Sequence, residues 1–301
     1  MARVAGKEIV APSGVAEVIT PAGIEIHYEA APRRLYRIRL DEAESSMALY
    51  ANWEEVPSVS TVLGVLDKPA LVWWGMKVGV AGLCELIDYQ HVTLSRQYPE
   101  SSLEIEQSQD EIIELLKRQK LTVNHQRDKA ADRGTNVHSA LEAWAETGVT
   151  PDPRFFPENE RGYVQGLVNF INDAHPHPLA SEVMVASLDG YAGRFDLLAN
   201  LDFAGKVVTK TYPKREDKRD QVNGAWLIDL KTSKDCYPSY HLQTAAYFRA
   251  LGECGYHLPD KYGILRVTED GRYELVESRA IYEDFKRVLD AYNSIERIKG
   301  K

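Results

Sequence analysis

Cysteine is scarce in this chain of 301 residues, and the spacing of its cysteines excludes several kinds of site. The three residues, Cys84, Cys236 and Cys254, are far apart and form no C-x-x-C pair. A zinc ribbon needs closely spaced thiolates, an iron–sulfur cluster held by thiolates usually needs four of them, and a disulfide framework needs paired cysteines. We therefore expect no structural zinc, no iron–sulfur cluster and no disulfide framework.

Long apolar runs are also absent. No segment reaches the roughly 20 consecutive apolar residues that span a bilayer, and the first residues, Met1 to Gly6, lack the apolar stretch of a secretory signal. The composition, with 44% hydrophobic residues, is that of an ordinary globular protein. We expect a cytoplasmic protein without a membrane partner and with ample material for a hydrophobic core.

Several catalytic motifs are missing as well. The chain has no G-x-x-x-x-G-K-[ST] phosphate loop, so we expect neither ATP binding nor a motor that unwinds a duplex. It also has no H-E-x-x-H helix, no G-x-S-x-G elbow and no dinucleotide-binding fingerprint. These absences remove the main sequence signals for zinc proteases, serine hydrolases and dehydrogenases.

Positive charge is in deficit, because 45 acidic residues outnumber 36 basic ones and give a net charge of -9. A protein that bound nucleic acid over its whole surface would carry the opposite sign. One segment, residues 206–219, is nevertheless strongly basic. We expect Lys210, Lys214 and Arg215 of this segment to contact nucleic acid locally, although a solvated loop has the same composition.

Periodicity and capping signals predict the secondary structure. Strands are expected near 23–29, 34–40, 191–201, 225–232, 262–267 and 272–277, and helices near 69–89, 110–119, 123–146, 158–174, 238–254 and 282–298. Ser58 is expected to cap a further helix, and Trp73 and Trp74 are expected to lie in the core. His175 to His177 is expected to be a loop, because prolines flank His177, and the next strand is expected to begin at Glu182.

The strand predicted from Ala225 to Thr232 places an acid and an amine side by side. Trp226 and Ile228 fall on one face, whereas Asp229 and Lys231 fall on the other. A charged pair on so apolar a strand costs free energy unless the charges are solvated, paired or coordinated. A solvated pair on an edge strand remains an alternative to a functional site.

The strand upstream, Tyr191 to Leu201, is apolar except where a glycine and an acid interrupt it. Gly193 leaves room for another backbone or a ligand to approach closely. Asp196 lies between Phe195 and Leu197, which form strands more readily than turns. We therefore favour metal ligation by Asp196 over a role in capping a turn.

The helix predicted from Pro238 to Cys254 carries a polar stripe. Gln243 and Tyr247 are four residues apart and therefore lie on one face. They have the pattern of an ordinary half-buried, hydrogen-bonded face. Beside the strand that carries Asp229 and Lys231, they are also suited to hold a phosphate or to fix the lysine.

Four short motifs follow one another along the chain: His138 on a helix, Gly193-x-x-Asp196, Asp229-x-Lys231 and Gln243-x-x-x-Tyr247. In this order they resemble the RecB-like branch of the PD-(D/E)xK nucleases, which includes lambda-exonuclease-like and CRISPR-adaptation nucleases. The likeness covers roughly residues 125–300 and is strongest to phage recombination exonucleases. CRISPR-adaptation relatives hold an iron–sulfur cluster through four cysteines, which three scattered cysteines cannot reproduce.

The resemblance implies a mixed α/β (α+β) protein with a restriction-endonuclease-like αβββαβ core. It places this core at residues 121–301 and a β-meander with accessory helices at residues 1–120. In such relatives the N-terminal region helps to hold DNA. Ser58, Ser60 and Lys68 are therefore candidate DNA contacts, as is Arg133, one turn before His138.

The resemblance also implies a metal site. His138, Asp196, Asp229 and the backbone carbonyl of Leu230 would ligate one or two divalent ions. Carboxylate oxygens suit Mg²⁺ or Mn²⁺, and an imidazole among them suits Mn²⁺ especially. Glu142, four residues after His138, is placed to orient the imidazole.

Catalytic roles follow from the same resemblance for Asp196, Asp229 and four further residues. Lys231 would orient a water molecule and stabilise negative charge, while Gln243 and Tyr247 would position the lysine or the scissile strand. Glu182 stands where many relatives carry an auxiliary acid.

The function implied is a metal-dependent exonuclease that hydrolyses linear DNA in phage or bacterial recombination, repair or replication. A single-strand annealing or recombination protein is a partner that such an enzyme would have, in a bacterial or phage-infected cell. Two alternatives stay open: a structure- or sequence-specific endonuclease on the same fold, and a DNA-end-binding protein without cleavage activity. Polarity and strand preference do not follow from the sequence.

Overall fold

The computed structural model describes residues 7–10, 15–29, 35–40, 53–66, 69–89, 91–92, 94–95, 104–105, 107–202 and 223–300. The protein is of the mixed α/β class, as the sequence predicts. The chain divides into two compact units, which we call the core unit (residues 1–66 and 136–301) and the helical unit (residues 67–135).

The core unit contains a five-stranded sheet formed by the N-terminal residues. Its antiparallel strands are β1 (Lys7–Val10), β2 (Val15–Ile19), β3 (Ile24–Glu29), β4 (Leu35–Leu40) and β5 (Glu54–Val56). Ile24 and Ile26 on β3 are buried, as is Ile38 on β4, so alternate residues of the two predicted strands face a core. The predictions of strands near 23–29 and 34–40 are confirmed.

The second sheet of the core unit has the order β12-β11-β10-β9-β8. Its strands are β8 (Pro176–Ser187), β9 (Tyr191–Leu201), β10 (Gly224–Lys231), β11 (Lys261–Val267) and β12 (Tyr273–Glu277). β9 is antiparallel to both β8 and β10, whereas β10 and β11 are parallel and are joined through α6 (Pro238–Glu253). With α5 (Glu158–Ala174) before β8, this is the helix, three strands, helix, strand order predicted from the sequence.

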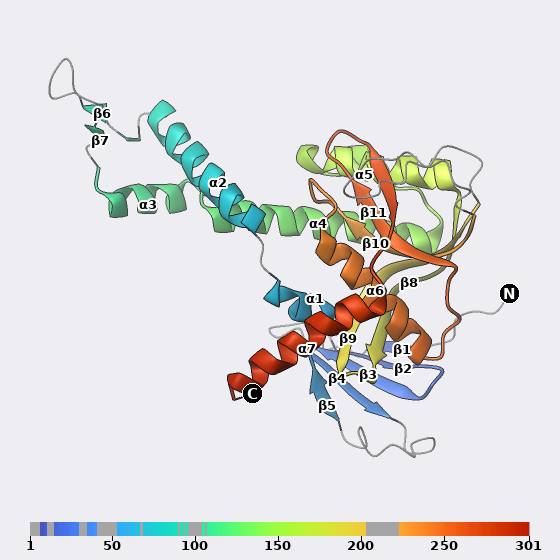
Figure 1. The fold of residues 1–301 in the computed structure, drawn as a ribbon. Coiled ribbons are helices and arrows are strands. Elements are labelled where there is room, and N and C mark those ends of the chain that lie inside the picture. The colour runs from blue at the N-terminus through green and yellow to red at the C-terminus, as the bar shows by residue number, and fades with distance from the viewer. Residues whose placement is uncertain are drawn as a thin grey trace. The chain divides into compact units, whose positions relative to one another are not determined.

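Helices cover both faces of this second sheet (Figure 1). On one face, Trp226 and Ile228 of β10 share a cluster with Leu141 of α4 (Val123–Thr147) and Phe170 of α5. On the other face, Leu227 shares a cluster with α6, with α7 (Tyr282–Ile298) and with the N-terminal sheet. The predicted alternation along β10 is therefore confirmed, and it puts Asp229 on the side of α6.

The N-terminal sheet is part of the core unit, so the compact units do not divide between residues 120 and 121 as the sequence suggested. Ile26 and Ile38 pack in the same cluster as Leu251 of α6 and Phe285 of α7. The amide of Ala22 also donates to the carbonyl of Cys254 at 3.0 Å. A thin sheet needs a second layer to bury its apolar face, and the C-terminal helices provide that layer.

The helical unit contains α2 (Pro69–Asp88), α3 (Gln109–Arg118), the first part of α4 and the short strands β6 (Leu94–Ser95) and β7 (Glu104–Ile105). Ser108 and Glu111 form a capping box at the start of α3. None of the described helices combines the length and apolar character needed to traverse a bilayer.

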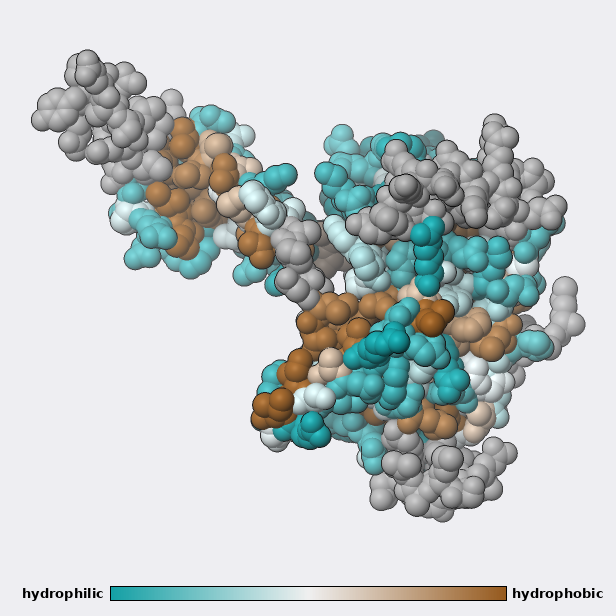
Figure 2. Space-filling view, viewed as in Figure 1, coloured by the Kyte–Doolittle hydropathy of each residue, from teal (hydrophilic) through white to brown (hydrophobic). Residues whose placement is uncertain are grey.

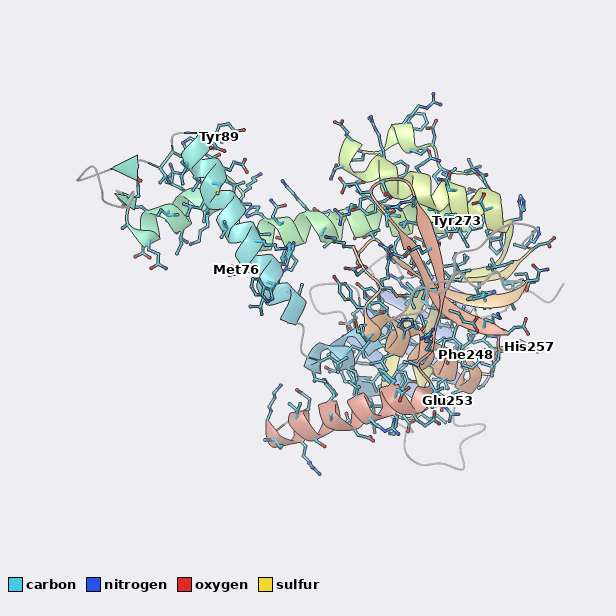
Figure 3. The ribbon with its side chains drawn as sticks, turned by 45° about the horizontal axis from the view of Figure 1, so that its top comes forward. Met76, Tyr89, Phe248, Glu253, His257 and Tyr273 are labelled. Carbon is cyan, nitrogen blue, oxygen red and sulfur yellow. The ribbon has the colours of Figure 1, made fainter. Side chains whose placement is uncertain are left out.

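Much of the apolar surface of α2 is exposed. Figure 2 shows apolar residues gathered on this helix. Met76 of α2 and Tyr89, which directly follows the helix, are labelled in Figure 3 and are 52% and 68% exposed. Trp73 is 64% exposed, so the prediction that it lies in the core is wrong. Because α2 is apolar around most of its circumference, periodicity could not indicate which side would be covered.

The predicted loop at His175 to His177 is also wrong, because β8 begins at Pro176. β8 is an edge strand of its sheet, and an edge strand tolerates prolines since one row of its backbone groups pairs with no neighbour. His175 ends α5 in a left-handed conformation with φ of 41°. The chain therefore enters the strand directly from the helix, and Glu182 lies in the middle of β8.

A buried arginine fastens the loop that follows β10. The guanidinium of Arg266 on β11 donates to the carboxylate of Glu274 on β12 at 2.6 and 2.9 Å. It also donates to the carbonyl of Lys234 at 2.5 Å. Because Lys234 lies three residues after Lys231, this clamp holds the end of β10 and the start of the loop to α6.

We expect Arg266→Met to lower the free energy of unfolding by roughly 3 to 5 kcal/mol, because it breaks a buried ion pair with Glu274 and removes the hydrogen bond to the carbonyl of Lys234. The matched control is Arg272→Met, which removes an ion pair with Asp270 on the surface and should produce no measurable change. Equilibrium denaturation of both variants measures the difference. Equal losses in the two variants would contradict a specific clamp.

Candidate active site

Three carboxylates lie in a row across β8, β9 and β10. Ser181 and Val183 of β8 pair with Leu197 and Phe195 of β9, which places Glu182 opposite Asp196. Leu197 in turn pairs with Ile228 of β10, so Asp229 follows as the neighbour of Asp196 on the other side. Directly opposed residues of antiparallel strands point to the same face. Register alone therefore brings three acids together.

The backbone at Glu182 adopts a conformation that side chains other than glycine rarely take. Its φ is 51°, in the left-handed region, although it lies within a strand. Such a conformation costs on the order of 1 to 3 kcal/mol and persists where surrounding structure enforces it, often at functional sites. The strain sits at the acid that the sequence marked only as auxiliary.

Asp196 is buried and contacts two donors. Nδ1 of His138, from α4, lies 2.8 Å from its Oδ1, and the amide of Leu230 donates to its Oδ2 at 2.5 Å. Burial alone would raise the pKa of Asp196, but His138, together with the charge of Lys231 and the amide of Leu230, outweighs it and holds the pKa below its ordinary value. Burial would likewise lower the pKa of His138, yet Asp196 raises it.

The donor atoms of His138, Glu182 and Asp196 all lie within 4.8 Å of one another. One imidazole nitrogen with two carboxylate oxygens is a donor set that fits Mn²⁺ or Mg²⁺. Asp229, predicted to share an ion with His138 and Asp196, is not in this group, and Glu182 takes its place. The amide of Leu230 contacts Asp196, and the predicted role of its carbonyl as a ligand stays a prediction.

Asp229 forms an ion pair with Lys231, whose Nζ lies 2.5 Å from Oδ2. Burial raises the pKa of Asp229, and the negative charge of Asp196 adds to this effect. Burial would lower the pKa of Lys231, but the carboxylates of Asp229 and Asp196 outweigh it and raise the pKa. Lys231 is therefore an ammonium at neutral pH, and its Nζ also lies 5.2 Å from the centre of the Tyr240 ring.

Gln243 and Tyr247 form the predicted stripe on α6. The side-chain amide of Gln243 donates to the Tyr247 hydroxyl at 2.9 Å. Burial raises the pKa of Tyr247 well above its ordinary value, so the phenol stays protonated. The room left by Gly193 is filled by this ring, because a Cβ at Gly193 would lie 2.5 Å from Cε1 of Tyr247. The glycine thus admits a side chain of the site itself.

Glu182 forms an ion pair that the sequence reasoning missed. Nε of Arg194 lies 2.7 Å from its Oε2. Burial raises the pKa of Glu182 to about 7, with Asp196 adding to the rise and Arg194 opposing it. The available signal was the spacing of Arg194 and Asp196, because residues two apart on a strand lie on the same face.

The predicted helix start at Ser58 lies beside β9. Ser58 forms a parallel bridge with Ala192, whose amide donates to the carbonyl of Pro57 at 3.1 Å. The Ser58 hydroxyl caps α1 (Val59–Val62), as predicted, and lies 2.9 Å from the hydroxyl of Ser60. The backbone at Ser58 therefore lies beside Ala192, the residue before Gly193, while the predicted contact of Ser58 and Ser60 with DNA stays a prediction.

The remaining predicted DNA contacts lie outside the described part of the core unit. Arg133 belongs to the helical unit, where it lines a groove together with Trp74 and Gln126. Lys68 lies outside the described residues, as do Lys210, Lys214 and Arg215 with the whole basic segment.

A comparison of the sequence with models of known protein families finds no match. A comparison with curated proteins also finds no match.

We expect Gly193→Ala to lower the free energy of unfolding by roughly 1 to 3 kcal/mol, because the added methyl group collides with the buried Tyr247 ring. Gly64→Ala is the control, since a Cβ at Gly64 meets no atom within 4 Å. Tyr247→Ala should abolish most of the cost of Gly193→Ala when the two are combined. Additive effects in denaturation experiments would contradict the proposed contact.

Proposed function

We propose that this protein is a metal-dependent exonuclease that hydrolyses the phosphodiester bonds of linear DNA. The observation that carries this proposal is the convergence of Glu182, Asp196 and Asp229 from three adjacent strands, with His138 and Lys231 paired to two of them. Buried acids crowded in this way are expensive for a purely structural protein, and they suit a site for a cation.

Hydrolysis of a phosphodiester requires that negative charge be neutralised, because the phosphate repels an incoming hydroxide. His138, Glu182 and Asp196 would hold a Mg²⁺ or Mn²⁺ ion. Such an ion would neutralise charge on the phosphoryl oxygens and would lower the pKa of a water molecule bound to it. Cytoplasmic Mg²⁺ would meet this need without any further cofactor.

Lys231 would stabilise the charge that develops on the phosphoryl group. Its ammonium is kept protonated by Asp229 and Asp196, so it is suited to stabilise charge and to orient water, and it is not suited to act as a base. Asp229 holds this ammonium in place. Gln243 and Tyr247, joined by a hydrogen bond, would position the scissile strand beside the lysine.

The choice of DNA as substrate, and of exonuclease over endonuclease, is supported by the motif order that resembles RecB-like enzymes. Of the parts of this order, the histidine on α4 lies beside Asp196, and the Gln-x-x-x-Tyr stripe on α6 places its Tyr247 ring against Gly193 of β9. A DNA-binding protein without catalysis would have no need for the complete set of Asp196, Asp229 and Lys231.

We expect Asp196→Asn, Asp229→Asn and Lys231→Ala each to reduce cleavage about 100-fold or more. Asp196→Asn removes a ligand of the proposed ion, Asp229→Asn removes the carboxylate that holds Lys231, and Lys231→Ala removes the ammonium that stabilises developing charge. Tyr247→Phe should be milder, since it retains the packing of the ring. The assay follows end-labelled linear DNA in Mg²⁺ and in Mn²⁺, with EDTA to remove the metal. Asp270→Asn, on the surface, is the control. Parental rates in Asp229→Asn and Lys231→Ala would show that the site is misassigned.

The mode of cleavage is tested with substrates that differ only in their ends. We expect linear duplex DNA to be degraded and closed circular DNA of the same sequence to stay intact. Labelling each end separately reveals the polarity. Cleavage of the circle at a rate similar to that of the linear form would favour the endonuclease alternative.

A further inference from the structure

Arg194 links Glu182 to the N-terminal sheet. It lies two residues before Asp196 on β9, and its Nε lies 2.7 Å from Oε2 of Glu182. The same guanidinium lies 5.7 Å from the centre of the Tyr28 ring on β3. Tyr28 in turn packs against the buried Tyr36 on β4, with ring centroids 4.7 Å apart. Arg194 is thus held from one side while it contacts Glu182 on the other.

Glu182 needs such a partner, because its backbone does not by itself favour the observed position. A glutamate has three rotatable side-chain bonds, and its carboxylate can take many places around a strained backbone. The contact with Arg194 restricts the carboxylate to one of them. Since a carboxylate has two oxygens with several lone pairs, this contact leaves acceptor sites for an ion.

We propose that Arg194 is a positioning residue that acts through Glu182 and completes the ion site formed with His138 and Asp196. This inference rests on the proposed function, since it requires that the site bind a divalent cation. Tyr28 of β3 holds the guanidinium in place. The N-terminal sheet thereby supports the site through one cation–π contact.

Two physical effects of Arg194 on a bound cation have opposite signs. Its positive charge repels a dication, so its removal would tighten binding if charge alone mattered. Its hold on Glu182 organises a ligand in advance, so its removal weakens binding if positioning matters more. Partners that orient metal ligands typically contribute about 10-fold to 100-fold in affinity. We infer that positioning is the larger effect here.

The test is a titration of the full chain with Mn²⁺, in which free Mn²⁺ is followed by electron paramagnetic resonance. Arg194→Ala should weaken Mn²⁺ binding about 10-fold to 100-fold. Arg194→Lys should weaken it less, because it keeps a cation and loses the planar group. Tyr28→Ala should weaken it slightly and Tyr28→Phe should leave it unchanged. Thermal unfolding confirms that each variant is folded. If Arg194→Ala does not fold, the Mn²⁺ affinity of Arg194→Lys is compared with that of the parent.

The chain offers a matched control on α6. Nε of Arg249 lies 2.7 Å from Glu253, labelled in Figure 3, and its guanidinium lies 5.4 Å from the Tyr282 ring. This constellation has the same three residue types at nearly the same distances, but it is not part of the candidate ion site. Arg249→Ala should therefore leave Mn²⁺ affinity unchanged.

A double variant decides whether Arg194 acts through Glu182. In the background of Glu182→Ala, the substitution Arg194→Ala should produce no further loss of Mn²⁺ affinity. The inference is overturned if Arg194→Ala binds Mn²⁺ as tightly as the parent or more tightly. It is also overturned if the double variant loses Mn²⁺ affinity by the sum of the two single losses. If the parent binds no Mn²⁺, or if Asp196→Asn binds it equally well, the proposed function fails together with the inference. If the parent binds Mn²⁺ and cleaves DNA but substitution of Arg194 changes neither, the inference is overturned and the proposed function stands.

Discussion

The central constraint on this structure is that three neighbouring carboxylates project from an apolar sheet. Their negative charges require partners, because little water is there to solvate them. Asp196 and Asp229 are buried, and Glu182 is nearly so. Each has its own cationic or imidazole partner: Arg194 for Glu182, His138 for Asp196 and Lys231 for Asp229. An unpaired charge at such a place would cost several kcal/mol, so the partners are as necessary to the fold as the acids are to the site.

The architecture explains why these partners come from different parts of the chain. Arg194 and Lys231 each lie two residues from an acid of the row, on the same strand, so strand geometry alone places them on the right face. His138 comes from α4, which packs on the opposite face of the sheet. Gly193 lets the Tyr247 ring of α6 approach β9 closely, and Arg266 fastens the loop after Lys231. The site is thus held between both helical layers.

The opposite pKa directions of Asp196 and Asp229 bear on what such a site does. Neighbouring acids whose pKa values are driven apart by their surroundings are a common feature of catalytic sites, because each then takes a separate role. Here Asp196 stays with His138 and Glu182, while Asp229 stays with Lys231. This division separates a carboxylate grouped with an imidazole from a carboxylate paired with an ammonium, and it is the arrangement on which the proposed function rests.

The sequence by itself determined most of the helices and strands and two residue pairs of the site. The alternation along β10 put Asp229 and Lys231 on one face, and the spacing of Gln243 and Tyr247 put them on one side of α6, because both follow from local periodicity. The exposure of Trp73 and the early start of β8 were missed, since each depends on which neighbour covers a surface or an edge.

Only the tertiary structure decided that Glu182 joins His138 and Asp196 in place of Asp229, and that Arg194 holds it. It also decided that the space beside Gly193 belongs to Tyr247 and that the N-terminal sheet packs with α6 and α7. These contacts depend on strand register and on packing between distant segments. Local patterns carry no record of register, because a shift of one residue changes the partners of every side chain while the sequence stays the same.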